Sequence, residues 1–393
     1  MNIAVITVVV LLSILSANEV AGAEQNVRVR LQHGQETIAV SALGLQIGRL
    51  TGVVDATLTT GLERAKIRRL PSGVWLVKRG SARTWEPVKS ETLAIRGQMV
   101  RLGVTPAPQN LELYANAKHG IDVISRMELE TYLSGVLPSE MPATWPLEAL
   151  KAQAVAARSF VMRTAFERRG KHFDVDSSIS DQVYKFVTDV KDHPELADKI
   201  RRAIGETRGE LLLDLRHRIL KAFYSADCGC QSEDPKFVWG TVDDFESVKD
   251  PSCGVQKTST WKLSLERREV REKLVTAFGL PSGAGLRTIN VGGRTPSGRV
   301  AAVVALLDVD GRARNIHIKS QEFRRIFGFE RVRSTDFSLR WMADSLEVSG
   351  RGAGHGVGLC QRGAQALAIQ GLDYRAILRL YYPKAKLVSP KSV

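Results

Sequence analysis

The chain of 393 residues contains 56 Lys and Arg against 42 Asp and Glu, which gives a formal net charge of +14 and a sequence pI of about 9.8. This length is enough for two domains with cores of their own, and the absence of low-complexity tracts and internal repeats excludes disordered and repeat architectures. The excess of positive charge favours a polyanionic partner, although a basic surface that only maintains solubility has the same composition.

The N-terminus has an uncharged apolar run from Met1 to Leu15, followed by the small residues Ala-Gly-Ala over 21–23. The run is shorter than the roughly 20 residues that span a bilayer, and such a triplet is typical of a signal-peptide cleavage site. We therefore predict an exported protein, in the periplasm or cell envelope or outside the cell, with a mature chain that begins near Glu24. No basic residue lies near Met1, so an uncleaved anchor is the alternative. No later segment is long enough to span a membrane.

From Val27 to about Val104, short runs alternate apolar and polar residues between Gly, Ser and Pro. This pattern predicts strands of a half-buried antiparallel sheet at 27–31, 37–41, 73–78 and 92–96. Residues 110 to about 240 are predicted to switch to helices with intervening loops. From Trp261, a helix near 266–278 and strands at 288–291, 300–306 and 315–318 are expected.

The chain is therefore predicted to be a compact α+β protein. We divide it into five segments: a signal peptide (1–23), a β-rich region (24–108), a core around residue 140 (109–255), a mixed α/β lobe (256–340) and a glycine-rich motif with C-terminal helices (341–393).

One acidic side chain has unusual neighbours. Glu140 lies in the run Ser-Glu-Met-Pro over 139–142 and is followed by Trp145-Pro146. Apolar surroundings raise the pKa of a carboxyl toward the range of a general acid, so Glu140 is the candidate acid for cleaving a glycosidic bond. Taken alone, an acid near a helix start is also commonly favoured by the helix dipole.

A helix is predicted directly after this acid, with Pro146 in its first turn and Gly170 at its end. Lys151 and Arg158 are seven residues apart and share one face of this helix, while the opposite side is apolar. The basic face could hold the carboxylates of a sugar acid, and a solvated charged face would have the same pattern.

The run from Gly350 to Ala364 has glycine at alternate positions before a helical segment. No Gly-Lys-Ser/Thr follows, so a phosphate loop is not expected. Glycines at this density let the backbone approach a ligand closely, and His355 could then point into a cleft as a hydrogen-bond partner or proton carrier. A lone His is otherwise more often structural.

Four cysteines in a chain that is predicted to be exported favour disulfides over a metal site. Cys228 and Cys230 are too close in sequence to pair with each other, so we expect one bond from this pair to Cys253 and another to Cys360. The alternative is a zinc site built from these thiols and a His, which the lack of a Cys-x-x-Cys spacing disfavours.

The stretch 127–160, which includes Glu140 and the run Lys-Ala-Gln-Ala-Val-Ala-Ala-Arg over 151–158, resembles the SpoIID/LytB family. This family is named for stage II sporulation protein D and the amidase enhancer LytB, and the likeness continues to the C-terminus. The resemblance implies a two-lobed architecture with a central glycan-binding cleft and a β-rich N-terminal region.

The resemblance also implies an activity. SpoIID-like enzymes are lytic transglycosylases, which protonate the glycosidic oxygen and close the 6-hydroxyl of the muramic acid onto C1, leaving a 1,6-anhydro end. Glu140 matches the family's catalytic Glu and would act first as acid and then as base. The implied substrate is glycan stripped of its stem peptides, whose free lactyl carboxylates suit basic residues, and Lys151 and Arg158 match basic positions of the family helix. No cofactor is implied.

Three further segments resemble family motifs. The run over 176–184 resembles a segment where some members bind zinc, but other residues occupy the ligand positions here, so no metal is expected there. The run Phe-Tyr-Ser over 223–225 resembles Phe-His-Ser, and the glycine-rich motif resembles Gly-x-Gly-x-Gly-His-Gly-Val-Gly-Met-Ser-Gln. The resemblance makes six side chains in these segments candidate sugar contacts, with plain packing as the alternative for Tyr184: Gln182, Tyr184, Tyr224, Ser225, His355 and Gln361.

Three functions compete for this sequence. The first is a lytic transglycosylase acting on denuded peptidoglycan strands. The second is a non-catalytic enhancer whose cleft binds glycan and recruits an N-acetylmuramoyl-L-alanine amidase as partner. The third, a basic wall-anchoring module without a defined site, is disfavoured by the glycine-rich motif. Retention of Glu140 favours the enzyme, because binding alone does not need an acid with a raised pKa. Nucleic acid is not an expected partner.

Overall fold

The computed structural model describes residues 26–50, 62–116, 120–186, 193–240, 245–253 and 258–389. The predicted signal peptide over 1–23 lies outside these ranges. Within them, no helix is both long enough and apolar enough to cross a membrane.

The N-terminal part forms a ten-stranded sheet with the order β10-β1-β9-β8-β6-β2-β3-β4-β5, and β7 pairs with β6. Neighbouring strands are antiparallel except β1 and β10, which are parallel. The strands are β1 Asn26–Gln35, β2 Thr37–Arg49, β3 Leu62–Arg69, β4 Trp75–Arg79, β5 Glu86–Val88, β6 Leu93–Leu102, β7 Thr105–Pro106, β8 Asn110–Ala115, β9 Ile121–Glu128 and β10 Val175–Asp176.

The alternating sequence pattern is confirmed in this sheet. In β3, for example, Ala65 and Ile67 are buried while the charged residues beside them are exposed. The expected strands at 27–31 and 37–41 fall within β1 and β2, while β6 and β4 cover most of those expected at 92–96 and 73–78.

The prediction of helices from residue 110 onward was wrong for its first part, because residues 110–115 and 121–128 are β8 and β9. β9 lies between β1 and β8, and its first five residues are all buried. Because Asp122 and Ser125 are buried together with their apolar neighbours, the strand shows no simple alternation of apolar and polar residues in the sequence. The first helix therefore begins at Leu129.

A helical region follows, in which helix α3 contacts the helices α2, α4, α8 and α9. Five of the 13 buried residues of α3 are alanine, and these small side chains let neighbouring helices approach from several sides. α3 ends at Glu167, three residues before Gly170. The helices are α2 Leu129–Glu140, α3 Leu147–Glu167, α4 Pro194–Glu206, α8 Gln361–Ile369 and α9 Tyr374–Tyr381.

Short elements connect this region. β11 (Leu211–Leu213) pairs with β20 (Lys386–Val388), and β12 (Tyr224–Ser225) pairs in parallel with β19 (Leu359–Cys360). The short helix α5 (Pro235–Trp239) follows β12.

A third region has its own apolar core, which includes Leu274, Val303 and Phe323. The expected helix near 266–278 and the three expected strands are confirmed here. The elements are β13 Thr260–Glu266, α6 Arg267–Phe278, β14 Gly285–Arg294, β15 Val300–Val309, β16 Arg312–Lys319, α7 Ser320–Phe327, β17 Phe337–Trp341 and β18 Ser345–Arg351.

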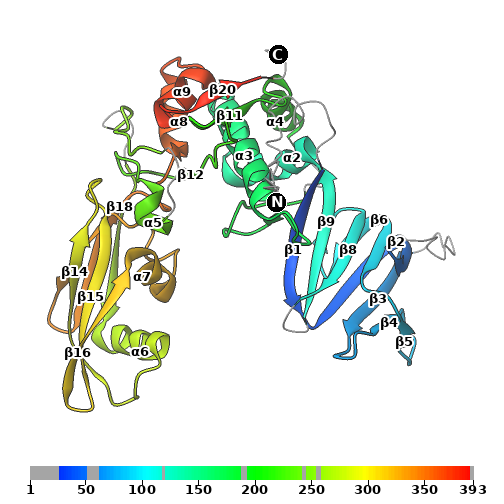
Figure 1. The fold of residues 1–393 in the computed structure, drawn as a ribbon, viewed down its shortest axis with the longest axis horizontal. Coiled ribbons are helices and arrows are strands. Elements are labelled where there is room, and N and C mark those ends of the chain that lie inside the picture. The colour runs from blue at the N-terminus through cyan, green and yellow to red at the C-terminus, as the bar shows by residue number, and fades with distance from the viewer. Residues whose placement is uncertain are drawn as a thin grey trace, which may run out of the picture.

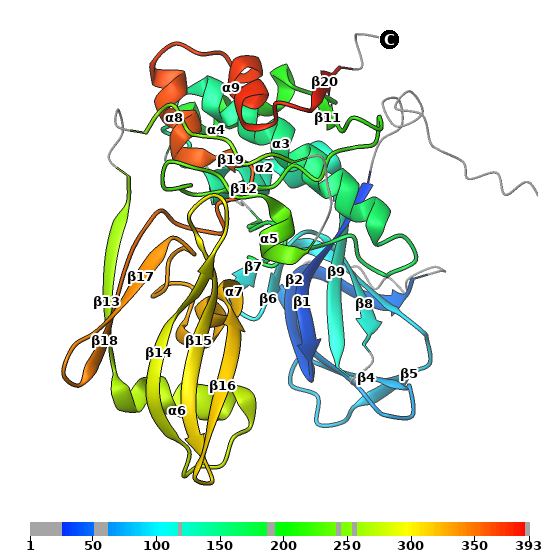
Figure 2. The same ribbon diagram turned by 60° about the vertical axis from the view of Figure 1, so that its left-hand side comes forward.

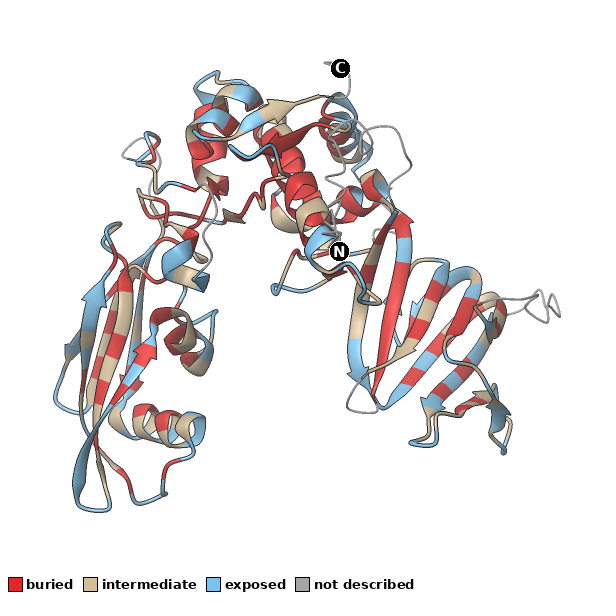
Figure 3. Cartoon of the chain, viewed as in Figure 1, coloured by how far each residue is buried: buried red, intermediate tan, exposed pale blue. Residues whose placement is uncertain are grey.

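The helical region lies between the N-terminal sheet and the β13–β18 region (Figure 1). In the turned view, α5 lies below the helices and between the two β-rich regions (Figure 2). Buried residues dominate α3 and alternate with exposed ones along the strands (Figure 3). The mixture of helices and strands confirms the predicted α+β class.

Candidate active site

Glu140 is the last residue of α2, and the N–H of the following residue, Met141, donates to the Leu137 carbonyl. The C-terminal end of a helix carries partial negative charge, which disfavours a carboxylate. The sequence had suggested an acid at the start of α3, where the dipole would favour the charge. The helix that bears on Glu140 is instead α2, and its dipole acts in the opposite direction.

The pKa of Glu140 is raised, because burial disfavours the carboxylate. The Val183 backbone N–H opposes this by donating to Oε1 at 2.7 Å, and the side chains of Tyr224 and Gln361 also favour the charged form. The buried Tyr224 hydroxyl nevertheless makes no hydrogen bond of ordinary geometry with any described residue. The surroundings of Glu140 therefore contain groups that stabilise its protonated form and groups that stabilise its carboxylate.

Two predicted sugar contacts, Gln182 and Tyr184, are packed inside the protein. Gln182 accepts a hydrogen bond from the Tyr132 hydroxyl at 3.0 Å and donates to the Ala157 carbonyl at 3.2 Å. Tyr184 stacks on Tyr132 with 5.4 Å between the ring centroids. These two side chains hold the backbone on both sides of Val183, so they position the N–H that binds Glu140.

The structure does not bring Lys151 and Arg158 to Glu140. Lys151 pairs with Glu148 at 2.7 Å and with Glu206. Arg158 is fully buried, and its guanidinium makes hydrogen bonds of 2.9 and 2.7 Å to the carboxylate of Glu130. The basic face that was expected to bind sugar acids is therefore engaged in ion pairs within the protein. It is not free because neighbouring helices cover α3 on several sides.

The surroundings of His355 favour its neutral imidazole form. Its pKa is lowered to about 3, because the ring is buried and lies near Arg324 and Arg299. Nδ1 accepts the Val357 N–H at 3.0 Å, and the ring also makes a hydrogen bond to the Tyr224 backbone. The lowered pKa disfavours the expected role in proton transfer near neutral pH, so this role stays a prediction, and the observed contacts hold the glycine-rich motif against β12.

The glycines of this motif serve close packing within the protein. Gly358 has a φ of +73°, and a Cβ at this position would collide with the Phe223 carbonyl. Parallel pairing places Ser225 opposite Cys360, so Gln361 follows directly at the start of α8. Ser225 is buried, and its hydroxyl has no hydrogen-bond partner among the described residues. The glycines were expected to let the backbone approach a ligand. In this structure they let β19 approach β12.

Two residues at the site escaped the sequence analysis. Gln153 of α3 accepts a hydrogen bond from the Gln361 amide at 3.4 Å, and its own Nε2 is buried without a partner among the described residues. Trp239 of α5 is 45% exposed and stacks on Phe223 with 4.4 Å between centroids. Its ring also meets the edge of His355 at 4.9 Å. The sequence contains signals for both residues: Gln153 is part of the run over 151–158, and Trp239 precedes a glycine after the Phe-Tyr-Ser run.

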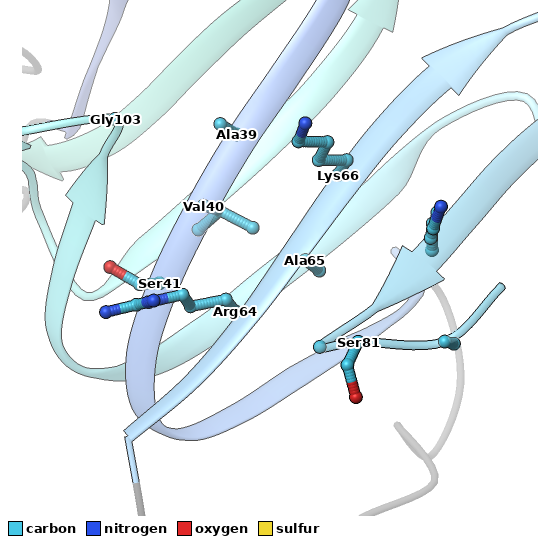
Figure 4. Close-up of a pocket in the computed structure, with 11 residues that line it drawn as sticks. Ala39, Val40, Ser41, Arg64, Ala65, Lys66, Ser81 and Gly103 are labelled. Carbon is cyan, nitrogen blue, oxygen red and sulfur yellow. The ribbon is translucent and has the colours of Figure 1, made fainter.

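A pocket of about 370 Å³ lies on the N-terminal sheet, away from Glu140 (Figure 4). It is lined by β2 and β3 and by the segment after β4, including the basic residues Arg64, Lys66 and Lys78. None of the residues around Glu140 lines it, so this hollow does not mark the candidate active site.

The cysteines follow the predicted pairing only in part. Cys230 and Cys253 form a disulfide, as expected for one of the two bonds. Cys228 and Cys360 are free and buried, which corrects the expectation of a second bond to Cys360. The Cys360 sulfur instead accepts the Cys228 backbone N–H at 3.2 Å.

Two family models match parts of this chain. The family model for the stage II sporulation protein, SpoIID, matches residues 117–213, and a domain of unknown function matches residues 245–358. Stage II sporulation protein D of Bacillus subtilis is 30% identical over 311 residues, which cover 75% of this chain and 84% of that protein.

Two further relatives extend the comparison. An uncharacterized protein of Brachyspira hyodysenteriae is 30% identical over 268 residues, 68% of each chain. The amidase enhancer of Bacillus subtilis is 27% identical over 299 residues, which cover 65% of this chain and 40% of that protein. The chain therefore belongs to the stage II sporulation protein D family.

Proposed function

We propose that this protein acts at the cell wall as a lytic transglycosylase. It cleaves the bond between N-acetylmuramic acid and N-acetylglucosamine in strands without stem peptides and leaves 1,6-anhydro ends. The observation that carries this proposal is Glu140, a single carboxyl with a raised pKa that also accepts a backbone hydrogen bond. Membership of the SpoIID family supports the same function.

The reaction needs one residue that changes roles. Protonated Glu140 donates its proton to the glycosidic oxygen as the bond from C1 to that oxygen breaks. The resulting carboxylate, stabilised by the Val183 N–H, then removes the proton of the C6 hydroxyl as that oxygen bonds to C1. No water is consumed, and Glu140 ends protonated as it began.

A second catalytic carboxylate, which most glycosidases require, is not needed because the substrate supplies its own nucleophile. The acid closest in sequence to Val183 is Asp181, and its carboxylate already accepts hydrogen bonds within the protein. Asp181 accepts a hydrogen bond from Arg168 at 2.9 Å and another from the Asp176 N–H at 2.7 Å. Asp181 therefore supports the loop and is a poor second acid.

In this proposal the glycan lies beside α2 and α5, in a cleft between the two β-rich regions. Trp239 offers an exposed ring whose position is fixed by its stack on Phe223, and a rigid aromatic face suits the apolar side of a sugar ring. The net charge of +14 supports a substrate with free carboxylates.

The test compares the mature protein with its Glu140→Gln variant on glycan strands freed of peptides and on intact sacculi. Products are analysed by mass spectrometry for anhydro-muramic ends. A matched control is Glu195→Gln, which changes an acid that is 65% exposed on α4. We expect products from the native protein and the control, and none from Glu140→Gln. Unchanged product yield in Glu140→Gln would remove the basis of the proposal.

A second candidate function is enhancement of an amidase, which the similarity to a relative named amidase enhancer favours. Under this function the protein binds glycan and increases the activity of a peptidoglycan amidase without cleaving strands itself. Binding without products in both native protein and Glu140→Gln, together with faster peptide release by an added amidase, would select it.

Both functions place the protein outside the cytoplasm. The bond between Cys230 and Cys253 supports export, because disulfides persist mainly in oxidising compartments.

A further inference from the structure

We propose that Cys228, Asp250 and Cys360 form a buried binding site for Zn²⁺. Their sulfur and carboxylate atoms all lie within 4.8 Å of one another, and all three residues are buried. In a tetrahedral zinc site, ligand bonds of about 2.0 to 2.3 Å place the ligand atoms roughly 3.3 to 3.8 Å apart. The Cys228 sulfur lies 3.2 Å from Asp250 Oδ2, so small adjustments suffice.

The ligands come from three separate segments, which explains why sequence spacing did not reveal them. Cys228 lies in the turn after β12, Asp250 lies 22 residues later, and Cys360 ends β19 and caps α8. The lack of a Cys-x-x-Cys spacing, which had argued against zinc, is therefore no obstacle to a site assembled by the fold.

The charge of Asp250 gives the first reason to expect a cation. The residue is only 6% exposed, and it makes no ion pair with any described residue. Neutral donors hold its two oxygens: the N–H and hydroxyl of Ser252 bind Oδ1, and the Tyr381 hydroxyl binds Oδ2 at 2.8 Å. A buried carboxylate without a countercharge is costly, and such outer hydrogen bonds are typical of carboxylates that bind metals.

Cys360 gives the second reason. Its sulfur accepts hydrogen bonds from the N–H groups of Cys228 at 3.2 Å and Gly363 at 3.3 Å, at the N-terminal end of α8. These two donors fix the sulfur beside Cys228 and Asp250, and cysteine binds zinc through its sulfur. The remaining cysteines are joined to each other, so the two free thiols both belong to this cluster.

The surroundings also provide room for the ion's fourth ligand. A small cavity of about 20 Å³ borders Asp250, Cys360 and Gly363, which is enough for about one water molecule. Arg362 also lines this cavity, but it donates to the Ser259 hydroxyl. Two thiolates, one carboxylate and Zn²⁺ sum to one negative charge, and buried Arg299, which donates to the Cys228 carbonyl, can balance it.

The bound ion would stabilise one wall of the candidate active site. Cys228 follows β12, which carries Tyr224, and Cys360 directly precedes Gln361. Zinc would therefore join the two segments whose side chains favour the Glu140 carboxylate. The inference does not depend on the reaction that Glu140 performs, since none of the three ligands touches that residue in the structure.

The test uses the mature, unaltered protein purified without chelators from zinc-supplemented medium. Elemental analysis should give close to one zinc per chain, and thiol titration in denaturant with a chelator should reveal two reactive thiols. Replacement by Co²⁺ should produce an absorption band for charge transfer from thiolate to cobalt. We expect Cys228→Ser and Cys360→Ser to abolish the band and Asp250→Asn to weaken affinity at least about tenfold.

The matched control is the double variant Cys230→Ser/Cys253→Ser, which removes the disulfide and should keep the metal. A chain without reactive thiols under denaturing conditions would mean a second disulfide and overturn the proposal. Two free thiols with no bound zinc or cobalt would overturn it as well. Both results come from the unaltered protein, so they hold even if a variant fails to fold, and glycan cleavage is measured separately.

Discussion

The backbone N–H of Val183 donates to Oε1 of Glu140 at 2.7 Å, and this bond joins a loop to the end of a helix 43 residues earlier in the chain. The donor is a main-chain group, so among replacements at 183 only proline removes it. Its position depends on Gln182 and Tyr184, which are anchored in the interior on either side. The acid is therefore tuned by residues that do not themselves contact it.

The raised pKa of Glu140 predicts a pH dependence of activity. Because the proposed first step needs the protonated acid, kcat/KM on denuded strands should fall as pH rises through the pKa of Glu140. Measurement of kcat/KM from pH 4 to 9 tests for this decrease. A profile that instead rises through this range would contradict the role of Glu140 as proton donor.

The same pKa predicts a pH dependence of stability. A carboxyl whose pKa is raised by folding stabilises the protein below its unfolded pKa, and this contribution is lost as pH rises through the folded pKa. Glu140→Gln has no such loss. The free energy of unfolding of the variant relative to the native protein should therefore increase between pH 4 and pH 8, measured by urea denaturation. An equal difference at both pH values would speak against the raised pKa.

Gln182→Leu is expected to impair activity through Val183. The change leaves the Tyr132 hydroxyl and the Ala157 carbonyl without their partner, at a cost of about 1 to 3 kcal/mol in stability. If the loop shifts and the Val183 N–H is lost, kcat falls at unchanged KM and the decrease in kcat/KM moves to higher pH. Ser159→Ala, which removes another buried hydrogen bond on α3, should lower stability without moving this decrease.

Arg158→Met should destabilise the protein without weakening glycan binding. The variant leaves the Glu130 carboxylate without its cation, and breaking one side of a buried pair costs about 3 to 5 kcal/mol. The double variant Arg158→Met/Glu130→Gln should recover part of this loss, which thermal or urea denaturation would detect. A higher KM in folded Arg158→Met, with no change in stability, would restore the direct role in substrate binding that the sequence suggested.

His355 should remain neutral across the physiological range. With a pKa of about 3, its imidazole signals in an NMR titration should not shift between pH 5 and 8. A folded pKa below the unfolded one also means that the contribution of His355 to stability is lost as pH falls below about 6.5. If the imidazole of His355 titrates near pH 6.5, the prediction of a neutral ring is wrong and a role in proton transfer is again supported.

Trp239→Ala should weaken glycan binding more than it slows the chemical step. Loss of an exposed, stacked ring removes contact area at a site that does not touch the reacting bond, so KM should rise about tenfold with little change in kcat. Phe237→Ala changes another exposed aromatic of α5 and serves as control. Equal effects of both replacements would indicate damage to α5 rather than loss of a sugar platform.

The sequence was informative where local rules decide the outcome. Strands with alternating residues, such as β2 with buried Ile38 and Val40, were predictable, as was the helix after Pro146. β9 was not, because a central strand that is buried on both faces loses its alternation. Motif likeness gave Glu140, but it could not show whether matched residues contact a ligand or one another.

The charged residues illustrate this limit most clearly. Lys151 and Arg158 share one helical face in the sequence, and only the fold shows that they form ion pairs with Glu206 and Glu130. The metal ligands are the converse case, since Cys228, Asp250 and Cys360 have no recognisable spacing and meet only through tertiary structure.

The parallel pairing of β1 with β10 has a consequence for how the protein matures. β1 begins at Asn26, two residues after the predicted start of the mature chain, and its pairing through Val29 and Arg30 fixes the segment that leads to Val183. Arg28 and Arg30 add ion pairs to Asp174 and Asp176. Under the predicted export, a cleavage that removed Arg28 and Arg30 would release a chain whose candidate site lacks this support, so the prediction needs the cut to fall before β1.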